Sequence, residues 1–189
     1  MKDPTFERLL DELERWNRKV NLTAVRDREQ MEVLHLADSL AVQPLLEGDT
    51  VLDVGTGPGF PGLPLAIAEP GRHFTLLDSN NKKIMFVQHM IGLLALDNVT
   101  AVNARSEDYA PGHRFDTVIA RALASLPRLV EVAGHHVGEG GVFIALKGRS
   151  PAAELEEVPA PWRHEVVELD VPGLERGSRH AVLLRRAGQ

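Results

Sequence analysis

The sequence predicts an α/β fold whose mainly parallel sheet is doubly wound, with helices on both faces. Apolar segments of strand length alternate with helical patterns over residues 49–150, and this alternation is typical of parallel strands joined by crossover helices. A glycine-rich turn follows the first strand, and after Pro151 two strand-like segments follow one another without a helix. We therefore expect a parallel core that ends in an antiparallel C-terminal hairpin at the sheet edge.

Two amphipathic patterns precede the first strand. Asp3 can cap a helix whose first position is Pro4, a residue that the first helical turn tolerates. The apolar side chains that follow at helical spacing are Phe6, Leu9, Leu10, Leu13 and Trp16. A second helix is expected over about residues 29–46, before Gly48. These helices would form an N-terminal helical cap, and the apolar face of the first is most simply core packing.

The remaining pattern divides the chain into strands and helices. Strands are expected at residues 50–54, 74–77, 99–102, 117–120 and 141–146, with helices at 82–96 and 125–137 and an apolar segment at 62–68. The hairpin strands are expected at 166–169 and 180–184. We expect a single domain over 1–189, with the cap over 1–48, the core over 49–150 and the edge strands over 151–189.

Composition excludes several classes of protein. The chain has 189 residues, of which 43% are hydrophobic, enough for one buried core. It lacks the apolar run of roughly 18 residues that a membrane helix needs, and it begins without the apolar stretch of a signal peptide. Without cysteine it can form neither disulfides nor thiolate sites, and His135-His136 has no accompanying ligand set. A cytoplasmic protein without a metal is the expectation.

The net charge of −6 is unlike that of most nucleic-acid-binding proteins, which neutralise phosphates with basic residues. Any contact with RNA would therefore depend on local patches or on other proteins at the substrate.

The glycine loop favours a ligand without phosphate. Its residues, placed between a strand and a helical segment, are Gly55, Thr56, Gly57, Pro58, Gly59 and Phe60. Glycines at such a place permit positive φ and close approach of the backbone to a cofactor. The loop lacks the Gly-Lys-Ser/Thr of a phosphate-binding loop. Phe60 occupies the place where a dinucleotide-binding fingerprint needs conformational freedom for its third glycine. S-adenosylmethionine carries no phosphate, so we expect this loop to bind that cofactor. A turn that merely needs glycine is the alternative.

Two acidic residues support this interpretation. Asp78 ends the second strand 23 residues after Gly55, at the distance where Rossmann-like sites place a carboxylate for ribose hydroxyls. A helix-capping aspartate is the alternative, and Ser79 could support the adenosine or cap the next helix. Asp53, inside an apolar strand, needs a partner. It could bind the backbone amides of the loop or face the amino group of the cofactor.

The sequence also resembles the bacterial small-subunit rRNA methyltransferase G family, known too as glucose-inhibited division protein B, over roughly residues 16–186. The matching segments are Asn21-Leu22-Thr23, His35 with Asp38-Ser39-Leu40, the loop from Asp53 to Gly62, Leu77-Asp78-Ser79 with Lys82-Lys83, Arg105-Ser106-Glu107, Phe115-Asp116 through Arg121-Ala122, Leu146-Lys147-Gly148 and Arg179-His180. The sequence departs from the family in a short N-terminal helical segment and in Ala120, where the family often has serine.

The resemblance implies a Rossmann-like class I methyltransferase fold. It implies methylation of guanine N7 in 16S rRNA near the decoding site, with S-adenosylmethionine as the donor and with 16S rRNA or a small-subunit precursor as the partner. The cofactor site would include Gly55 and Phe60. Asp78 and Ser79 would meet the adenosine, and Ser106 and Glu107 would flank the adenine. Arg121 would lie near both cofactor and substrate, which makes it the candidate catalytic residue.

Guanine N7 carries a free lone pair, so its attack on a methyl group needs alignment and no general base. The sequence agrees, because it lacks the Asn/Asp-Pro-Pro-aromatic motif of many amine methyltransferases and the cysteine of cytosine C5 enzymes. The positive charge that forms on the base would be stabilised by Glu107 or Asp116 only if either lies close by.

Several charged residues keep two interpretations each. Arg121 ends an apolar strand, where it could pair with a phosphate, guanine O6 or the cofactor carboxylate, or form a structural salt bridge. Lys147 and Arg149 could bind RNA phosphates or belong to a solvated turn. His35 and Asp38, three residues apart on a helix, could hydrogen-bond.

Two other functions stay open at this point. One is a Rossmann-like methyltransferase with a protein or small-molecule substrate, although no larger substrate-covering insertion is visible. The other is a non-catalytic module that binds RNA or the ribosome. We expect a monomer, and the sequence leaves open whether naked RNA or an assembled particle is the substrate.

Overall fold

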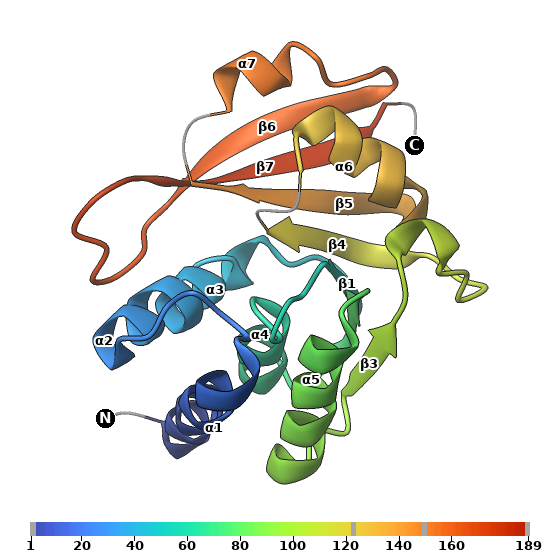
Figure 1. Ribbon diagram of the computed structural model, residues 1–189. Coiled ribbons are helices and arrows are strands. Elements are labelled where there is room, and N and C mark those ends of the chain that lie inside the picture. Colours follow the sequence, from blue (N-terminus) through green and yellow to red (C-terminus); the bar gives the residue numbers. More distant parts are fainter. Residues whose placement is uncertain (1–2, 122–123, 149–150, 188–189) are drawn as a thin grey trace.

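The computed structural model describes residues 3–121, 124–148 and 151–187. A seven-stranded sheet has the order β3-β2-β1-β4-β5-β7-β6, with helices on both faces (Figure 1). The strands are β1 (Thr50–Val54), β2 (His73–Asp78), β3 (Val99–Asn103), β4 (Phe115–Arg121), β5 (Val137–Lys147), β6 (Trp162–Leu169) and β7 (Arg179–Arg186). β1 to β5 pair in parallel, and β7 runs antiparallel to β5 and β6. The predicted Rossmann-like sheet with its antiparallel C-terminal hairpin is confirmed.

Helices cover both faces of this sheet. They are α1 (Pro4–Val20), α2 (Arg28–Met31), α3 (Asp38–Leu40), α4 (Gly62–Ala68), α5 (Asn81–Leu94), α6 (Leu126–Ala133) and α7 (Ala152–Leu155). A π-helical segment spans Glu32–Ala37, and short 3₁₀ turns span Gln43–Leu45, Ser106–Asp108 and Gly134–His136. Within the described residues, no helix is long and apolar enough to cross a membrane.

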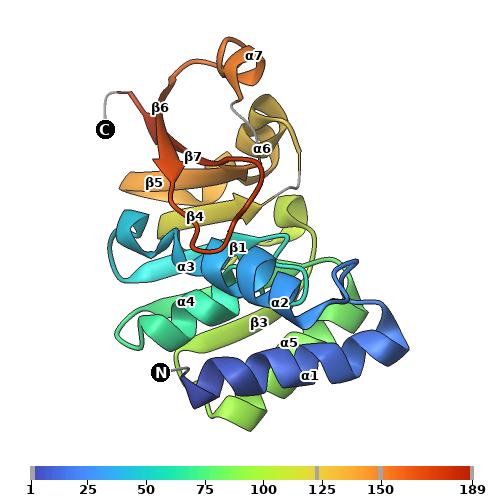
Figure 2. The same cartoon turned by 90° about the vertical axis from the view of Figure 1, so that its left-hand side faces the viewer.

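Successive side chains along a strand belong to two separate hydrophobic cores, one on each face of the sheet. Val51 of β1 belongs to the core under α1, α4 and α5, whereas its neighbour Leu52 belongs to the core under α6. This division follows from the two-residue repeat of a strand. Figure 2 shows α1, α4 and α5 gathered on one side of the sheet. The helices on opposite faces leave the carboxyl ends of the strands free for a site.

The first helix forms as predicted. The Asp3 carboxylate caps α1 by accepting from the Thr5 amide at 2.7 Å, and the helix ends where Asn21 takes a positive φ of 51°. Leu9 and Leu13 are fully buried, and the helix packs against α5. The expected core-packing role of this face is confirmed.

The second helix is not the continuous element that was expected over residues 29–46. It opens into the π-helical segment, where the Asp38 amide donates to the Val33 carbonyl five residues earlier. The Ser39 hydroxyl donates to the His35 carbonyl within this wide turn. Pro44, which lacks a donor, then sits in the 3₁₀ turn at the end. The prediction of one continuous helix is therefore wrong, but its placement of helical residues in this segment is correct.

Elsewhere the bounds shift by a few residues. The helix expected over 125–137 ends at Ala133 and passes through a 3₁₀ turn into β5, which begins at Val137. α7 was not expected. The loop 170–178 between β6 and β7 returns to the π-helical segment, where Gly173 lies against Val33. This contact joins the C-terminal hairpin to the N-terminal cap.

Gly62, the first residue of α4, supplies a stability test. A Cβ there would lie 2.1 Å from Leu76 Cδ2 and 2.8 Å from Asp53 Oδ2, whereas one on Gly71 would have no atom within 4 Å. Gly62→Ala is therefore expected to lower the free energy of unfolding by about 1–3 kcal/mol, and Gly71→Ala to change it by no more than about 0.5 kcal/mol. Denaturant unfolding measures both, and equal midpoints would contradict the packing described for α4.

Candidate functional site

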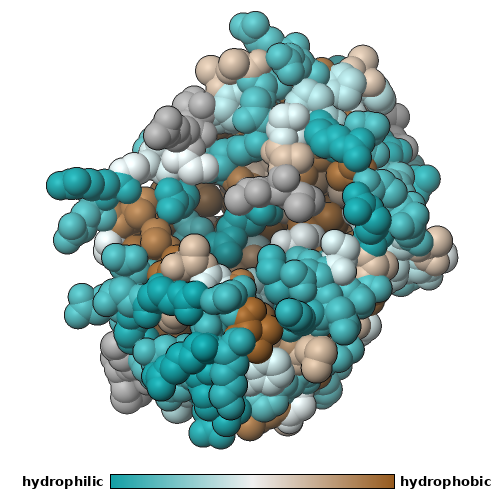
Figure 3. Space-filling model, viewed as in Figure 1, coloured by the Kyte–Doolittle hydropathy of each residue, from teal (hydrophilic) through white to brown (hydrophobic). Residues whose placement is uncertain are grey.

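Two connected cavities lie at the carboxyl ends of the strands. β1 pairs with β2 on one side and β4 on the other, so the chain leaves β1 at the point where open α/β sheets bind ligands. A wide cavity of ≈ 670 Å³ and a narrow one of ≈ 210 Å³ share Gly55, Asp78 and Ser79 in their walls. Figure 3 shows the molecule hollowed near its middle, with both hydrophilic and hydrophobic residues around the hollow.

The glycine loop forms one wall of the wide cavity. Its residues there are Gly55, Thr56, Gly57, Pro58 and Phe60. Gly57 has a φ of 60° and Gly59 a φ of 90°, a region that side chains rarely tolerate. Gly59 lies outside both linings and packs close to Leu63. The loop is thus shaped by its glycines, and five of its six residues line this cavity.

Asp53 anchors the loop from below. Its side chain is 1% exposed, and Oδ2 accepts from the Thr56 hydroxyl at 2.6 Å and the Gly62 amide at 2.9 Å. Burial raises the pKa of this carboxyl to about 6, although both hydrogen bonds oppose the shift. Oδ1 has no partner among the described residues. Asp53 therefore binds the loop, as one of its two interpretations predicted, and retains a buried acceptor that suits a cationic group.

Asp78 lies between the two cavities. Its Oδ2 accepts from the Gly57 amide at 2.9 Å and its Oδ1 from the Asn80 amide at 2.8 Å. Each carboxylate oxygen has further lone pairs for a ligand hydroxyl. The cap of α5 is Asn80, whose side chain accepts from the Lys82 amide at 3.0 Å. The capping alternatives for Asp78 and Ser79 are therefore wrong, and sequence reasoning missed Asn80.

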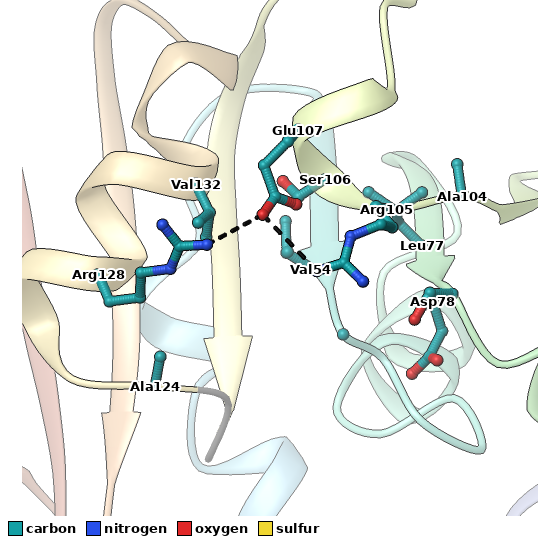
Figure 4. A pocket seen from close by; sticks show the side chains of 12 residues that line it. Val54, Leu77, Asp78, Ala104, Arg105, Ser106, Glu107, Ala124, Arg128 and Val132 are labelled. Atoms are coloured by element: carbon teal, nitrogen blue, oxygen red, sulfur yellow. Dashed lines mark hydrogen bonds and ion pairs between the residues drawn. The ribbon is translucent and has the colours of Figure 1, made fainter.

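The narrow cavity combines apolar walls with a buried hydroxyl (Figure 4). Val54, Leu77 and Val132 contribute apolar surface, and Ser106 is buried with no partner for its Oγ among the described residues. Glu107 pairs with Arg128 of α6 at 3.2 Å. The predicted residues Ser106 and Glu107 thus line the same cavity as Asp78.

Buried polar atoms without a partner gather around these cavities. The described residues contain four such atoms, namely His35 Nδ1, Asp53 Oδ1, Ser106 Oγ and His180 Nδ1. Three of these residues line a cavity, and Asp53 lies beneath the loop. Native proteins leave few buried polar groups unpaired. This concentration therefore fits a polar ligand in both cavities.

Arg121 closes the far side of the wide cavity. Its Nη1 donates to the Leu34 carbonyl at 3.1 Å and lies 3.3 Å from Asp38 Oδ2. Asp38 Oδ1 accepts from Arg179 Nε at 2.7 Å. Arg121 therefore forms a salt bridge, as its structural interpretation predicted. It also lines the cavity, as its functional interpretation requires.

His35 does not bond to Asp38, so that expectation is wrong. Its Nε2 lies 3.0 Å from Thr23 Oγ1, and its ring stacks on Phe60 with centroids 5.0 Å apart. Burial, together with the charge of Arg121, lowers the pKa of His35 to about 4. The His35 side chain, which lines the cavity, is therefore uncharged at pH 7.

Other predicted residues lie elsewhere or have partners. Asp116 accepts from the Asp49 and Thr50 amides at the amino end of β4, so it cannot stabilise a base at the carboxyl end. Lys147 lines the wide cavity, and its Nζ pairs with Glu154 at 2.8 Å. Arg149 lies outside the described residues.

The wide cavity is locally positive. Its lining contains four basic residues (Lys83, Arg121, Lys147 and Arg179) and two acidic ones (Asp38 and Asp78), a difference of +2, in a chain of net charge −6. Such a local patch is what contact with RNA would require of an acidic chain. No group of three or more His, Cys, Asp or Glu side chains that could bind a metal occurs in the described parts.

The raised pKa of Asp53 generates a pH test. Between its ordinary pKa of 3.8 and about 6, folded Asp53 keeps a proton that the unfolded chain has released, so its contribution to the free energy of unfolding falls as pH rises. Asp53→Asn removes this titration and keeps an oxygen for Thr56 and Gly62. From about pH 5 to about pH 7.5, the variant should gain about 1–2 kcal/mol on the wild type in denaturant unfolding without ligand. Parallel pH profiles would contradict this.

Comparisons with known proteins agree with this geometry. The ribosomal RNA small subunit methyltransferase G of Idiomarina loihiensis is 49% identical, covering 92% of this chain and 84% of that protein. The protein of that name from Psychromonas ingrahamii is 48% identical, covering 94% and 86%. The solved DhpI–SAH complex shares the fold, with a TM-score of 0.63 and 18% identity over 98% of this chain and 96% of that chain.

The resemblance found in the sequence is thereby confirmed. The protein family described as rRNA small subunit methyltransferase G matches residues 2–182. The chain belongs to the rRNA small subunit methyltransferase G family.

Proposed function

We propose that this chain transfers a methyl group from S-adenosylmethionine to N7 of a guanine in 16S rRNA near the decoding site. The observation that carries the proposal is the pair of joined cavities at one edge of the sheet. The narrow cavity suits an adenosine, and the wide, positively charged cavity has room for a nucleotide of an RNA chain. Membership of the family supports the nature of the substrate and of the donor.

The cofactor would span both cavities. Asp78 would accept hydrogen bonds from the ribose hydroxyls, and Ser106 and Glu107 would flank the adenine. Gly55, Thr56, Gly57, Pro58 and Phe60 line the methionine part, while Gly59 acts through the shape of the loop. The free oxygen of Asp53 suits the cofactor's amino group. When bound, S-adenosylmethionine supplies an electrophilic methyl group on its sulfonium sulfur.

The acceptor base would enter the wide cavity beside Arg121. Nε and Nη2 of Arg121 have no acceptor among the described residues, so they remain for guanine O6 or a phosphate oxygen. Guanine N7 has no proton to lose. The cavity matches this, because His35 is neutral while Asp38 and Asp78 are engaged by arginines and amides. Alignment of the base is therefore the main task of these residues.

The two alternative functions have less support from this site. A methyltransferase for a protein or small molecule has no specific feature in its favour. A non-catalytic RNA- or ribosome-binding module would bind the cofactor in the same cavities, but it has no specific feature in its favour either. We further propose that the chain acts as a single domain and a monomer in the cytoplasm, where bacterial ribosomes assemble.

Nucleoside analysis tests the proposal. Labelled S-adenosylmethionine and the purified chain are incubated with 30S subunits, and separately with naked 16S rRNA, from a strain that lacks the modification. We expect label in 7-methylguanosine after digestion. Label in protein would reject the proposal in favour of a protein methyltransferase, and cofactor binding without transfer to either substrate would reject it in favour of a non-catalytic module. Label in another nucleoside would reject guanine N7 as the acceptor.

Arg121 supplies a second prediction. Arg121→Ala should lower the rate of methyl transfer by about 100-fold, because the base loses its positioning contact, and this loss should exceed any loss of fold stability seen in the melting temperature. The matched control is Arg185→Ala, which removes an arginine of β7 that pairs with Glu47 at 2.6 Å. Similar losses of transfer in both variants, or wild-type transfer in Arg121→Ala, would refute the role of Arg121.

A further inference from the structure

We propose that Asp38 is a positioning residue that fixes the Arg121 guanidinium for methyl transfer. The inference rests on the proposed function and deepens it. Asp38 begins α3, Arg121 ends β4, and Arg179 begins β7, so three distant segments of the chain meet at one carboxylate beside the wide cavity.

The carboxylate of Asp38 is divided between two arginines. Oδ2 lies 3.3 Å from Arg121 Nη1, and Oδ1 lies 2.7 Å from Arg179 Nε. The side chain of Asp38 is only 9% exposed, and those of Arg121 and Arg179 are 21% and 24% exposed. Water therefore screens these charges poorly, and the carboxylate is the group that lets two guanidiniums lie together.

The contacts of Arg121 fix the orientation of its guanidinium as well as balancing its charge. Its Nη1 is shared between Asp38 and the Leu34 carbonyl, one turn earlier in the same helical segment. Both contacts engage the same nitrogen, which leaves Nε and Nη2 without an acceptor in the described residues. Asp38 thus sets which edge of the guanidinium faces the cavity.

The helical segment that carries Asp38 is itself fixed from two sides. His35 stacks on Phe60 of the glycine loop, and Val33 packs against Gly173 in the loop after β6. Both contacts are made by residues of the π-helical segment itself, and π-helical turns are often found at functional sites. The position of Asp38 is therefore tied to the loop that we assign to the cofactor.

A second ion pair serves as a structural comparison. Glu47 pairs with both terminal nitrogens of Arg185, at 2.8 Å and 2.6 Å. Like Asp38–Arg179, this pair joins the region before β1 to β7, but neither residue lines a cavity. A residue that only connects these segments should behave like Glu47.

The test compares Asp38→Asn, Asp38→Glu and Glu47→Gln in the full chain. The measurements are kcat and KM with 30S subunits or 16S rRNA, the dissociation constant of S-adenosylhomocysteine and the melting temperature. For Asp38→Asn we expect kcat to fall by about 10- to 100-fold, with S-adenosylhomocysteine affinity within about 3-fold of the wild type. Asp38→Glu should recover part of kcat because it restores the charge, and Glu47→Gln should retain kcat.

Wild-type kcat in Asp38→Asn would overturn the inference, and so would equal losses in kcat and melting temperature for Asp38→Asn and Glu47→Gln. If Asp38→Asn does not fold, Asp38→Glu decides: a lower kcat at unchanged S-adenosylhomocysteine affinity supports the inference, and wild-type kcat overturns it. A wild-type chain that transfers no methyl group to RNA overturns the proposed function and this inference together, whereas an active wild type with an equally active Asp38→Asn overturns the inference alone.

Discussion

The carboxylate of Asp53 anchors the glycine loop on which both cavities depend. One oxygen bonds to Thr56 near the start of the loop and to Gly62 at its end, so the whole turn is drawn against the end of β1. The loop then presents the Gly57 amide to Asp78, and this contact orients the carboxylate between the cavities. The cost is a buried charge with a raised pKa and one unsatisfied oxygen, a cost that a cationic ligand group would offset.

The opposite wall depends on the N-terminal cap. Asp38 brings Arg121 and Arg179 together, which places basic side chains around a cavity in an acidic chain. Much of the cap's own charge is paired within it, as where Arg28 lies 2.5 Å from Glu7 and 2.8 Å from Asp11. The negative net charge and a positive cavity are therefore compatible. In the proposed function, the base that accepts the methyl group would lie on the side of the cap, and the methyl donor would lie on the side of the glycine loop.

Short sequence patterns predicted those features of the site that depend on residues close together in the chain. The strand Thr50–Val54 and the helix Gly62–Ala68 lie where expected, because apolar runs and glycines determine them directly. The π-helical turn was not predictable, since Leu34 and Asp38 take their partner from Arg121, more than 80 residues away. Likewise, the strand expected at 117–120 placed Arg121 at its carboxyl end, but only the structure shows that Asp116, at the amino end of β4, lies away from the cavities. Asn80 was missed because Asp78 and Ser79 also had capping chemistry, and only the backbone path separates them.

We propose that the cofactor lies across the carboxyl ends of β1, β2 and β3 and that the base enters beside β4. A crystal structure of the chain with S-adenosylhomocysteine measures this most directly. We predict ribose hydroxyls within hydrogen-bonding distance of the Asp78 carboxylate, the adenine in the narrow cavity beside Ser106, and the sulfur facing Arg121 across the wide cavity. An adenosine bound in the wide cavity against Arg179 and His180, with the narrow cavity free, would contradict the account.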